Sequence, residues 1–521
     1  MSDSAVATDT HRPSTGAEQP EPARAGRDGF GELVRRVALS AWFAPTAFAA
    51  LVVTWHIGKP EMWHDELVTV DVATRSTRQI LRLLENVDAV HGAYYLFMHA
   101  WTTLVGAGPT AVRLPSALAM TVATACVALA GQRLFDRTTG VAAGFVFALV
   151  PTVTRFGQET RSYALVVLGA ALATLFLLRA LERPGLWRWA AYTLTVAALG
   201  VLNVVSLTLL LGHGVAVLVH WWRQRRLWLL VQFALSVGAG LGLALPVIMR
   251  GMRQAGRQIS WIPDSQPWTV WEQTVGSTLL AAALTALAAL GLLAHLRRRP
   301  GTTSRPATAA LIAVLPLPVI LVASTGEINY FFSKYLLFVL PAWAVLAGAG
   351  VAALRRVPLV AAALVVVAAL AVPGQQALRA EFSHGWYTYP QARAFQPLSY
   401  SEAARLIAAE YQPGDGMAAG GPWWWMHDPG VRYYLPKDIT PRNVFQARSA
   451  ADRAELFGAD CPEPARCLRD EPRIWVVLPK VTDEPLTGLP RKQSAALAER
   501  YDVVRVEHPR GLTVALLQRK G

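Results

Sequence analysis

The sequence predicts a polytopic α-helical membrane protein of about eleven transmembrane helices, with its N-terminus in the cytoplasm, followed by a C-terminal extracytoplasmic α/β domain. Three observations predict this fold class. Of the 521 residues, 53% are hydrophobic and only 16% are charged, and the mean hydropathy is +0.32. The apolar residues gather in runs of about 17 to 25 residues, which suffice to cross a bilayer. Short basic clusters separate the runs, as in the loops of membrane proteins.

The net charge of +14 belongs to the membrane part of the chain. From Ala380 to the C-terminus, 18 Lys and Arg residues stand against 17 Asp and Glu residues, so nearly all of the excess lies before that point. Basic clusters between apolar runs are typical of cytoplasmic loops. We therefore predict no nucleic-acid partner, and the composition excludes a soluble enzyme, a coiled coil and collagen.

Residues 1–30 are rich in Pro, Ala, Gly and charge, which predicts a disordered cytoplasmic tail. The first apolar run, Val37–Ile57, follows Arg35 and Arg36 and is too long for a signal-peptide core. It is predicted to be an uncleaved span that opens a membrane domain of residues 31–375.

After a first external loop at 58–110, ten further runs predict spans. They lie near residues 111–133, 140–156, 162–181, 187–203, 204–222, 228–248, 276–297, 307–325, 333–354 and 357–373. Ala93–Val105 is apolar but short for a span, and we interpret it as an interfacial helix. With that choice, all five later basic clusters fall on the cytoplasmic side, as the positive-inside rule requires. They begin at Arg133, Arg183, Arg223, Arg297 and Arg355.

Because successive spans alternate in direction, the same count of spans places the C-terminal region, residues 376–521, outside. Its pattern is that of an α/β domain, with an amphipathic helix at Ser401–Tyr411, an apolar strand at Ile474–Leu478 and a hairpin within Tyr501–Leu517. Cys461 and Cys467 either form a short disulfide loop or remain free, depending on the compartment. The run Trp423-Trp424-Trp425 either stacks on sugar rings or forms a buried aromatic cluster.

Two adjacent carboxylates, Asp65 and Glu66, follow the first span in Met62-Trp-His-Asp-Glu66. Burial at the membrane surface would raise a carboxylate pKa and make the group a better base. The alternative is a pair of solvated loop acids. His64 also suggests a metal ligand, but no second His or Cys stands at ligand spacing, so no metal is assigned and a divalent ion stays an alternative.

Cations recur on the predicted external side. Arg155 and Arg161 lie at the external end of a predicted span, and Tyr163 follows Arg161. Basic residues are usually found on the cytoplasmic side, so arginines in this place suggest a local anion. The alternative is interfacial snorkelling or pairing with Glu159. Lys334 and Tyr335 begin the tenth span, where anchoring at the interface explains them equally well.

Arg250, Arg253 and Arg257 recur at helical spacing and would share one face of a helix. Together with the carboxylate pair, these separated cations suit a lipid-linked phosphate substrate. Cations would hold the phosphate leaving group while a carboxylate deprotonates an attacking hydroxyl. No Gly-rich phosphate loop stands between a strand and a helix, which disfavours a nucleotide-dependent enzyme.

At these residues the sequence resembles the integral-membrane glycosyltransferases of the type C fold, the broad family of protein O-mannosyltransferases and lipid A aminoarabinose transferases. The likeness covers most of residues 38–375. Its most specific points, in order, are Asp65-Glu66, Ala93-Tyr-Tyr-Leu-Phe-Met-His-Ala-Trp, Arg113-Leu-Pro-Ser, Arg133-Leu-Phe, Gly157-Gln-Glu-Thr-Arg161-Ser-Tyr163 and Lys334-Tyr335 before Pro341.

The resemblance implies a sugar donor linked to polyprenyl phosphate and a first-loop acid as catalytic base. Asp65 becomes the base, and Glu66 its partner or a group that orients the acceptor. Arg161 and Tyr163 become donor contacts. The remaining residues assigned to substrate binding are His64, Tyr94, Arg250, Arg253, Lys334 and Tyr335.

Two departures from the family pattern stand out. His91-Gly92-Ala93 replaces a frequent Pro-Pro before the Tyr-Tyr pair, and Lys334-Tyr335 replaces a usual Arg-Tyr. Lysine binds phosphate as a point charge and lacks the bidentate fork of arginine.

The predicted reaction is an inverting transfer of a sugar, mannose in the first instance, to an acceptor hydroxyl of a protein, lipid or glycan at the outer face of the cell membrane. A pentose donor such as an arabinose derivative, with a lipid or cell-wall glycan as acceptor, is the enzyme alternative. A transporter or flippase of lipid-linked sugars is the other, although transporters carry charges inside their spans and here most charges sit at span ends.

Overall fold

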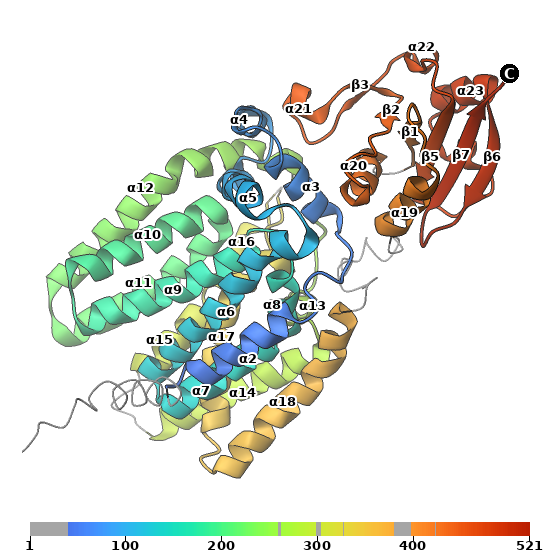
Figure 1. Ribbon diagram of the computed structural model, residues 1–521. Coiled ribbons are helices and arrows are strands. Elements are labelled where there is room, and N and C mark those ends of the chain that lie inside the picture. Colours follow the sequence, from blue (N-terminus) through green and yellow to red (C-terminus); the bar gives the residue numbers. More distant parts are fainter. Residues whose placement is uncertain (1–39, 259–261, 299–303, 327, 380–397, 422–423) are drawn as a thin grey trace, which may run out of the picture.

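The computed structural model describes residues 40–258, 262–298, 304–326, 328–379, 398–421 and 424–521 (Figure 1). The predicted tail at 1–30 lies outside them. Seven helical segments within these ranges are long and apolar enough to cross a membrane. They are α6 (Pro109–Leu134), α9 (Tyr163–Glu182), η2 with α11 (Val204–Thr208 and Leu209–Gln224), α12 (Leu227–Gln258), α14 (Thr278–Arg298), α15 with α16 (Ser304–Val314 and Pro316–Ala323) and α18 (Val357–Leu378).

The remaining predicted spans are shorter or bent. Helices α7 (Arg137–Leu149) and α8 (Pro151–Gly157) meet at 64° and together make an eighth candidate. Three predicted spans correspond to apolar helices of 10–17 residues, which are α2 (Phe43–Thr54), α10 (Leu186–Leu202) and the segment of η5 (Leu337–Val339) and α17 (Leu340–Ala352). The structure therefore supports seven or eight spans by length, and the count of eleven stays a prediction.

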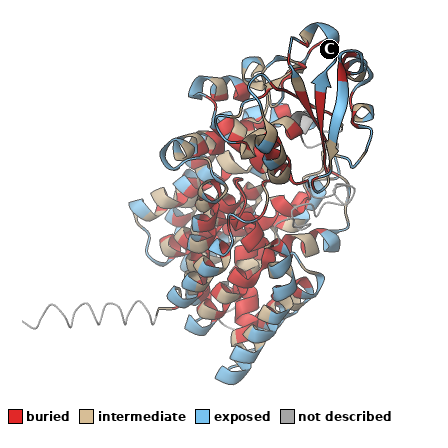
Figure 2. Ribbon diagram, turned by 45° about the vertical axis from the view of Figure 1, so that its right-hand side comes forward, coloured by how far each residue is buried: buried red, intermediate tan, exposed pale blue. Residues whose placement is uncertain are grey.

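Small residues let the central helices approach closely. Helix α17 packs against α7 and α14, and a Cβ on Gly348 would collide with the backbone of Ala143. A Cβ on Gly350 would collide with the backbone of Leu287 in the same way. Figure 2 shows the buried residues concentrated in the middle of the helical part, whereas leucines such as Leu243 and Leu279 are exposed on outer faces, as on lipid-facing helices.

The first external loop folds as short helices above the bundle. They are α3 (His64–Ala73), α4 (Thr77–Asn86), η1 (Ala89–His91) and α5 (Gly92–Val105). Helix α4 begins with a capping box, in which Ser76 and Gln79 satisfy each other's backbone amides. Helix α5 covers the segment predicted as interfacial and is not among the helices long and apolar enough to span.

The C-terminal region contains a five-stranded mixed sheet of order β2-β1-β5-β7-β6. Strand β1 is parallel to β2 and β5, and β7 is antiparallel to β5 and β6. Its main elements are α19 (Tyr400–Glu410), β1 (Gly416–Ala419), α20 (Trp424–Tyr434), β2 (Arg442–Asn443), β5 (Arg473–Leu478), η8 (Pro485–Gly488), α23 (Arg491–Arg500), β6 (Tyr501–Glu507) and β7 (Thr513–Arg519). The segment between β2 and β5 adds β3 (Gln446–Arg448), α21 (Ala450–Arg453), β4 (Ala459–Asp460) and α22 (Pro464–Cys467).

Several local predictions for this region hold. The predicted helix is α19, and the predicted hairpin is β6–β7, whose turn uses Gly511 at φ 73°. Cys461 and Cys467 form a disulfide. Only the backbones of Trp424 and Trp425 are described and Trp423 lies outside the described residues, so the aromatic-cluster prediction is untested.

The sheet region docks on the first loop through α20, which lies beside α3 in Figure 1 and also packs against α19. Met62, Leu67 and Val70 share one apolar cluster with Tyr400 and Val431. The carboxylate of Glu61 accepts a hydrogen bond from the Ser401 amide at 2.6 Å, near the positive end of α19. Helix α3 is therefore held between the membrane helices and the C-terminal region.

Candidate functional site

Asp65 meets two cations that come from distant parts of the chain. It lies in the first turn of α3, and its Oδ2 accepts a hydrogen bond from Lys334 Nζ at 3.2 Å. Arg161 Nε, from the loop between α8 and α9, lies 3.9 Å from the same oxygen. Lys334 belongs to η4 (Ser333–Tyr335), 269 residues further along the chain. The structure thus brings together three of the predicted site residues.

Exposure distinguishes the carboxylate from its cations. The Asp65 side chain is 26% exposed, whereas the side chains of Lys334 and Arg161 are 7% and 8% exposed. Burial raises the pKa of the Asp65 carboxyl, but the two cations lower it by more, so that pKa lies well below its usual value. The unliganded site therefore holds an ionised, accessible carboxylate beside two nearly buried positive charges.

Arg161 is positioned by residues of the first loop. Its Nη2 lies 2.9 Å from His91 Nε2, and its Nη1 donates to Thr69 Oγ1 at 3.4 Å. Burial and the neighbouring Arg161 charge lower the pKa of His91 well below its usual value, so His91 is neutral and can accept from the guanidinium. No sequence pattern assigns His91 a role, although it stands at a departure from the family pattern.

Glu66 has a different environment from its neighbour Asp65. Its carboxylate is fully buried and forms a bidentate pair with Arg113, at 2.8 and 2.7 Å, and it also accepts from the Thr160 amide at 2.9 Å. Arg113 also donates to the Ile57 and Pro60 carbonyls at 2.9 and 2.8 Å. This arrangement joins α3, α6 and the α8–α9 loop, and it leaves Glu66 no surface on which to orient an acceptor.

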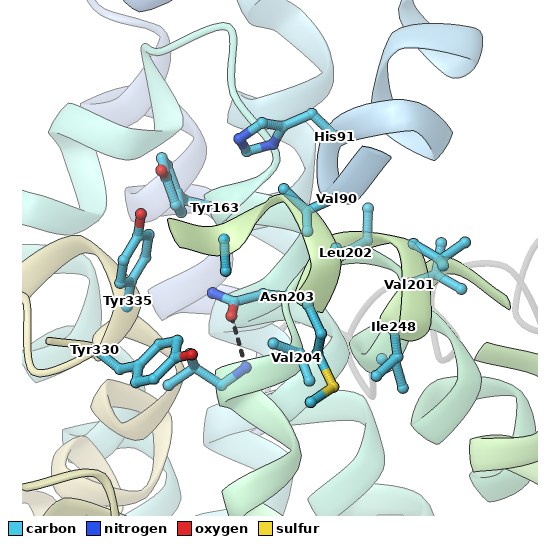
Figure 3. Close-up of a pocket in the computed structure, with 16 residues that line it drawn as sticks. Val90, His91, Tyr163, Val201, Leu202, Asn203, Val204, Ile248, Tyr330 and Tyr335 are labelled. Carbon is cyan, nitrogen blue, oxygen red and sulfur yellow. Dashed lines mark hydrogen bonds between the residues drawn. The ribbon is translucent and has the colours of Figure 1, made fainter. Parts of the chain in front are cut away.

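An apolar cavity of roughly 100 Å³ opens beside the charged cluster (Figure 3). Tyr163 and Tyr335 form one wall, with ring centroids 6.4 Å apart, and His91 lies at the edge. Lys334 Nζ lies 5.6 Å from the centre of the Tyr163 ring, within range of a cation–π interaction. The rest of the wall is mostly aliphatic and includes Val90, Leu202, Val204, Val247 and Ile248.

Two further predicted residues lie behind or beside the cluster. Tyr94 is 1% exposed and packs with Met62 and Met98 in the apolar cluster, so it supports the site without lining it. His64 faces the C-terminal region, where Tyr400 Oη lies 3.4 Å from its Nε2. Burial lowers the pKa of His64 to about 4, so its imidazole is neutral at pH 7.

Arg250 and Arg253 do not join the cluster. Both are exposed on α12, although Gly251 and Met252 between them line the cavity. Arg257 is described by its backbone alone. Any phosphate contact by these arginines stays a prediction.

Arg161 at the mouth of α9 lies 3.9 Å from the Asp65 carboxylate, and a further anion bound at this place stays a prediction. Glu159 is fully buried, and burial raises its pKa to about 8 in spite of the nearby Arg155. Among the described residues no group of three or more His, Cys, Asp and Glu side chains could hold a metal ion.

Comparisons with known proteins give a partial sequence match. The sequence model of the dolichyl-phosphate-mannose-protein mannosyltransferase family matches residues 93–249. No curated protein matches the chain by sequence.

Solved structures match over nearly the whole chain. ArnT from Cupriavidus metallidurans bound to undecaprenyl phosphate is 14% identical with a TM-score of 0.60, covering 93% of this chain and 98% of that one. Its apo state gives 15% identity and a TM-score of 0.59, over 95% and 98%. The oligosaccharyltransferase of Archaeoglobus fulgidus gives 13% identity and a TM-score of 0.44, over 91% and 73%. The likeness to ArnT confirms the predicted type C fold of membrane glycosyltransferases.

Proposed function

We propose that this protein transfers a sugar from a polyprenyl-phosphate-linked donor to an acceptor hydroxyl on the extracytoplasmic side of the membrane, with inversion. One observation carries the proposal. An accessible carboxylate, Asp65, lies between two nearly buried cations, Lys334 and Arg161, beside an apolar cavity. A lipid phosphate ester needs this combination of an apolar surface and adjacent positive charge.

The donor would lie across this arrangement. The apolar cavity takes the first isoprene units, and Lys334 and Arg161 hold the phosphate. The acceptor oxygen attacks the anomeric carbon as Asp65 takes its proton, and the bond from that carbon to the phosphate oxygen breaks. Polyprenyl phosphate leaves with the bonding electrons, which the two cations stabilise. A single displacement of this kind inverts the anomeric configuration.

Donor binding would also activate the base. In the unliganded site, Lys334 and Arg161 lower the pKa of Asp65 and so make it a weak base. An anionic phosphate bound to the same cations offsets their charge, while the burial that raises the pKa persists. Asp65 therefore becomes more basic only when the donor is in place, which suppresses proton abstraction in its absence.

Two findings support the choice of donor lipid and sugar. The ArnT structure with the same fold holds undecaprenyl phosphate, which supports a polyprenyl phosphate carrier. The family model that matches residues 93–249 describes mannosyltransferases, which supports mannose as the sugar. A pentose is the second candidate, because the matched range contains Arg161 but neither Asp65 nor Lys334, so two of the three charged residues of the cluster lie outside it.

The extracytoplasmic location rests on the positive-inside pattern of the loops. The Cys461–Cys467 disulfide in the C-terminal region is consistent with that side, because disulfides persist in oxidising compartments. A reporter fused after Gly140 is expected to report a cytoplasmic location, and an external location would refute the topology.

Sugar transfer by the purified protein in detergent tests the function. The protein is given radiolabelled polyprenyl-phosphate mannose with a Ser/Thr-rich peptide or a membrane lipid extract. Wild type is compared with Asp65→Asn, and Glu85→Gln serves as a matched control because Glu85 is an exposed acid of the same loop. We expect transfer by wild type and the control, and none by Asp65→Asn, which still binds the donor. Full activity of Asp65→Asn would remove Asp65 from its role.

A further inference from the structure

A second, larger cavity lies on the other face of α3. Asp65 and Thr69 face the cations, whereas Leu67, Val70 and Thr74 line a cleft of roughly 960 Å³ between the first loop and the C-terminal region. The opposite wall comes from α20, from β2 and β3, and from α21. We call this space the α3–α20 cleft.

Two ion pairs line the α3–α20 cleft, one on each wall. Asp71 of α3 pairs with Arg75, just after that helix, at 2.6 Å, and Asp428 pairs with Arg432 at 2.7 Å on α20. The Asp71 side chain is 41% exposed and that of Arg432 is 32% exposed, whereas their partners Arg75 and Asp428 are 5% and 13% exposed. One wall therefore offers an accessible carboxylate and the other an accessible guanidinium. Among the described residues that line the cleft, Lys437 is the one further charged residue.

Backbone contacts fix the charged groups in place before any ligand binds. Arg75 Nη1 donates to the Glu455 carbonyl at 2.9 Å, and Arg432 Nη2 donates to the Pro441 carbonyl at 2.6 Å. Asn443 donates to the second oxygen of Asp428 at 3.3 Å. The walls therefore present preorganised planar polar groups and lose little side-chain freedom when they bind a ligand.

Aromatic surface completes the lining. Phe457 is 40% exposed at the cleft, and the Tyr433 ring is held by a hydrogen bond from its hydroxyl to the Ala107 carbonyl at 2.8 Å. Aromatic faces supply apolar contact at low entropic cost, while the neighbouring polar groups set orientation.

We propose that the α3–α20 cleft binds a neutral oligosaccharide, the part of an acceptor glycan that lies beyond the reacting hydroxyl. The proposal rests on the proposed sugar transfer for its biological use, but not for the binding itself. Each carboxylate already has a guanidinium partner, so the lining does not favour a strongly charged ligand. Sugar hydroxyls can donate to the Asp71 carboxylate on one wall and accept from the Arg432 guanidinium on the other, and an aromatic face can contact the ring.

The position of the cleft gives binding a consequence for the reaction. Helix α3 forms one wall of the cleft and carries Asp65 on its other face. A glycan held along this wall would be kept close to the base, which raises the effective concentration of its terminal hydroxyl. The acceptor would then be a glycan rather than a peptide side chain.

Binding to the full-length protein in detergent tests the proposal without any turnover. Neutral tetrasaccharides of mannose, of arabinose and of glucose, and a Ser/Thr-rich peptide, are titrated into the protein by calorimetry. The variants are Asp71→Asn and Asp428→Asn. The control is Asp470→Asn, which removes a paired, 89% exposed carboxylate elsewhere on the C-terminal region. Melting midpoints show whether each variant is folded.

We expect at least one tetrasaccharide to bind, with affinity about tenfold weaker in each cleft variant and unchanged in the control. Asp65→Asn is expected to bind the tetrasaccharide as wild type does, so the test of glycan binding is independent of the test of sugar transfer. The proposal is overturned if no tetrasaccharide binds at millimolar concentration, if binding survives in both folded cleft variants, or if the peptide alone binds the cleft.

Discussion

Replacing Glu66 by Gln should destabilise the protein strongly, although the residue adjoins the proposed base. The side chain keeps its shape but loses its charge, and one carboxylate oxygen becomes an amino group. The Arg113 guanidinium, which is completely buried, then loses the carboxylate that forms a bidentate pair with it.

The magnitude follows from the contacts that are lost. The Glu66 carboxylate accepts two hydrogen bonds from Arg113 and one from the Thr160 amide. Breaking a buried ion pair by removing one partner costs about 3 to 5 kcal/mol, because the other charge stays buried without compensation. Carbonyl oxygens of Ile57 and Pro60 still accept from Arg113, so we expect a loss of about 3 kcal/mol.

Thermal unfolding in detergent, followed by tryptophan fluorescence, measures the effect alongside sugar transfer. Glu66→Gln should melt well below wild type, and its residual turnover should keep the pH dependence of the wild type, because the base is intact. Glu85→Gln, an exposed acid of the same loop, should melt as wild type does. Polyprenyl phosphate should not rescue Glu66→Gln, since the Arg113 site is sealed.

One pair of results would refute this reasoning. If Glu66→Gln melted as wild type does and yet lost all turnover, then Glu66 would act in the chemistry, and the assignment of a supporting role from its burial would be wrong.

Three further predictions concern pH and the apolar cavity. Because the cations hold the pKa of Asp65 low in the free enzyme, kcat/KM should stay level down to about pH 5. With saturating donor, kcat should begin to fall at a higher pH. If kcat and kcat/KM fell at the same acidic pH, this would contradict donor-induced activation. Burial raises the pKa of Glu61 to about 7 from 4.5, so its contribution to folded stability is complete below pH 4.5 and is lost as pH rises through 7. Between pH 5 and pH 8 the melting midpoint of wild type should therefore fall by more than that of Glu61→Gln. If the two midpoints changed with pH in parallel, Glu61 would not be the source of the pH dependence. Val204→Trp should fill the apolar cavity and raise KM for a long-chain donor about tenfold, since about two buried CH₂ groups of the lipid lose contact. It should not raise KM for a short, water-soluble donor. Equal effects on both donors would mean that the lipid binds elsewhere.

The sequence alone determined the membrane class and the position of most apolar helices. Hydropathy is a local property, so runs of apolar residues and the basic clusters between them are visible without any knowledge of contacts. The short Ala93–Val105 segment was also interpretable, because loop charge parity depends only on order along the chain. The predicted boundary between the spans 187–203 and 204–222 falls at Asn203, which separates α10 from η2. The end of the first span was less certain, because α2 ends at Thr54, just before the αL residue His56.

Only the tertiary structure could separate the fates of Asp65 and Glu66. The two acids are adjacent and alike in sequence, yet one is 26% exposed beside Lys334 and the other is buried against Arg113. Burial and partners depend on which distant segments pack together, and Lys334 lies 269 residues from Asp65. The contact of His91 with Arg161 and the different surroundings of the two faces of α3 likewise depend on tertiary packing. A sequence gives the spacing of side chains on a helix but not what each face contacts.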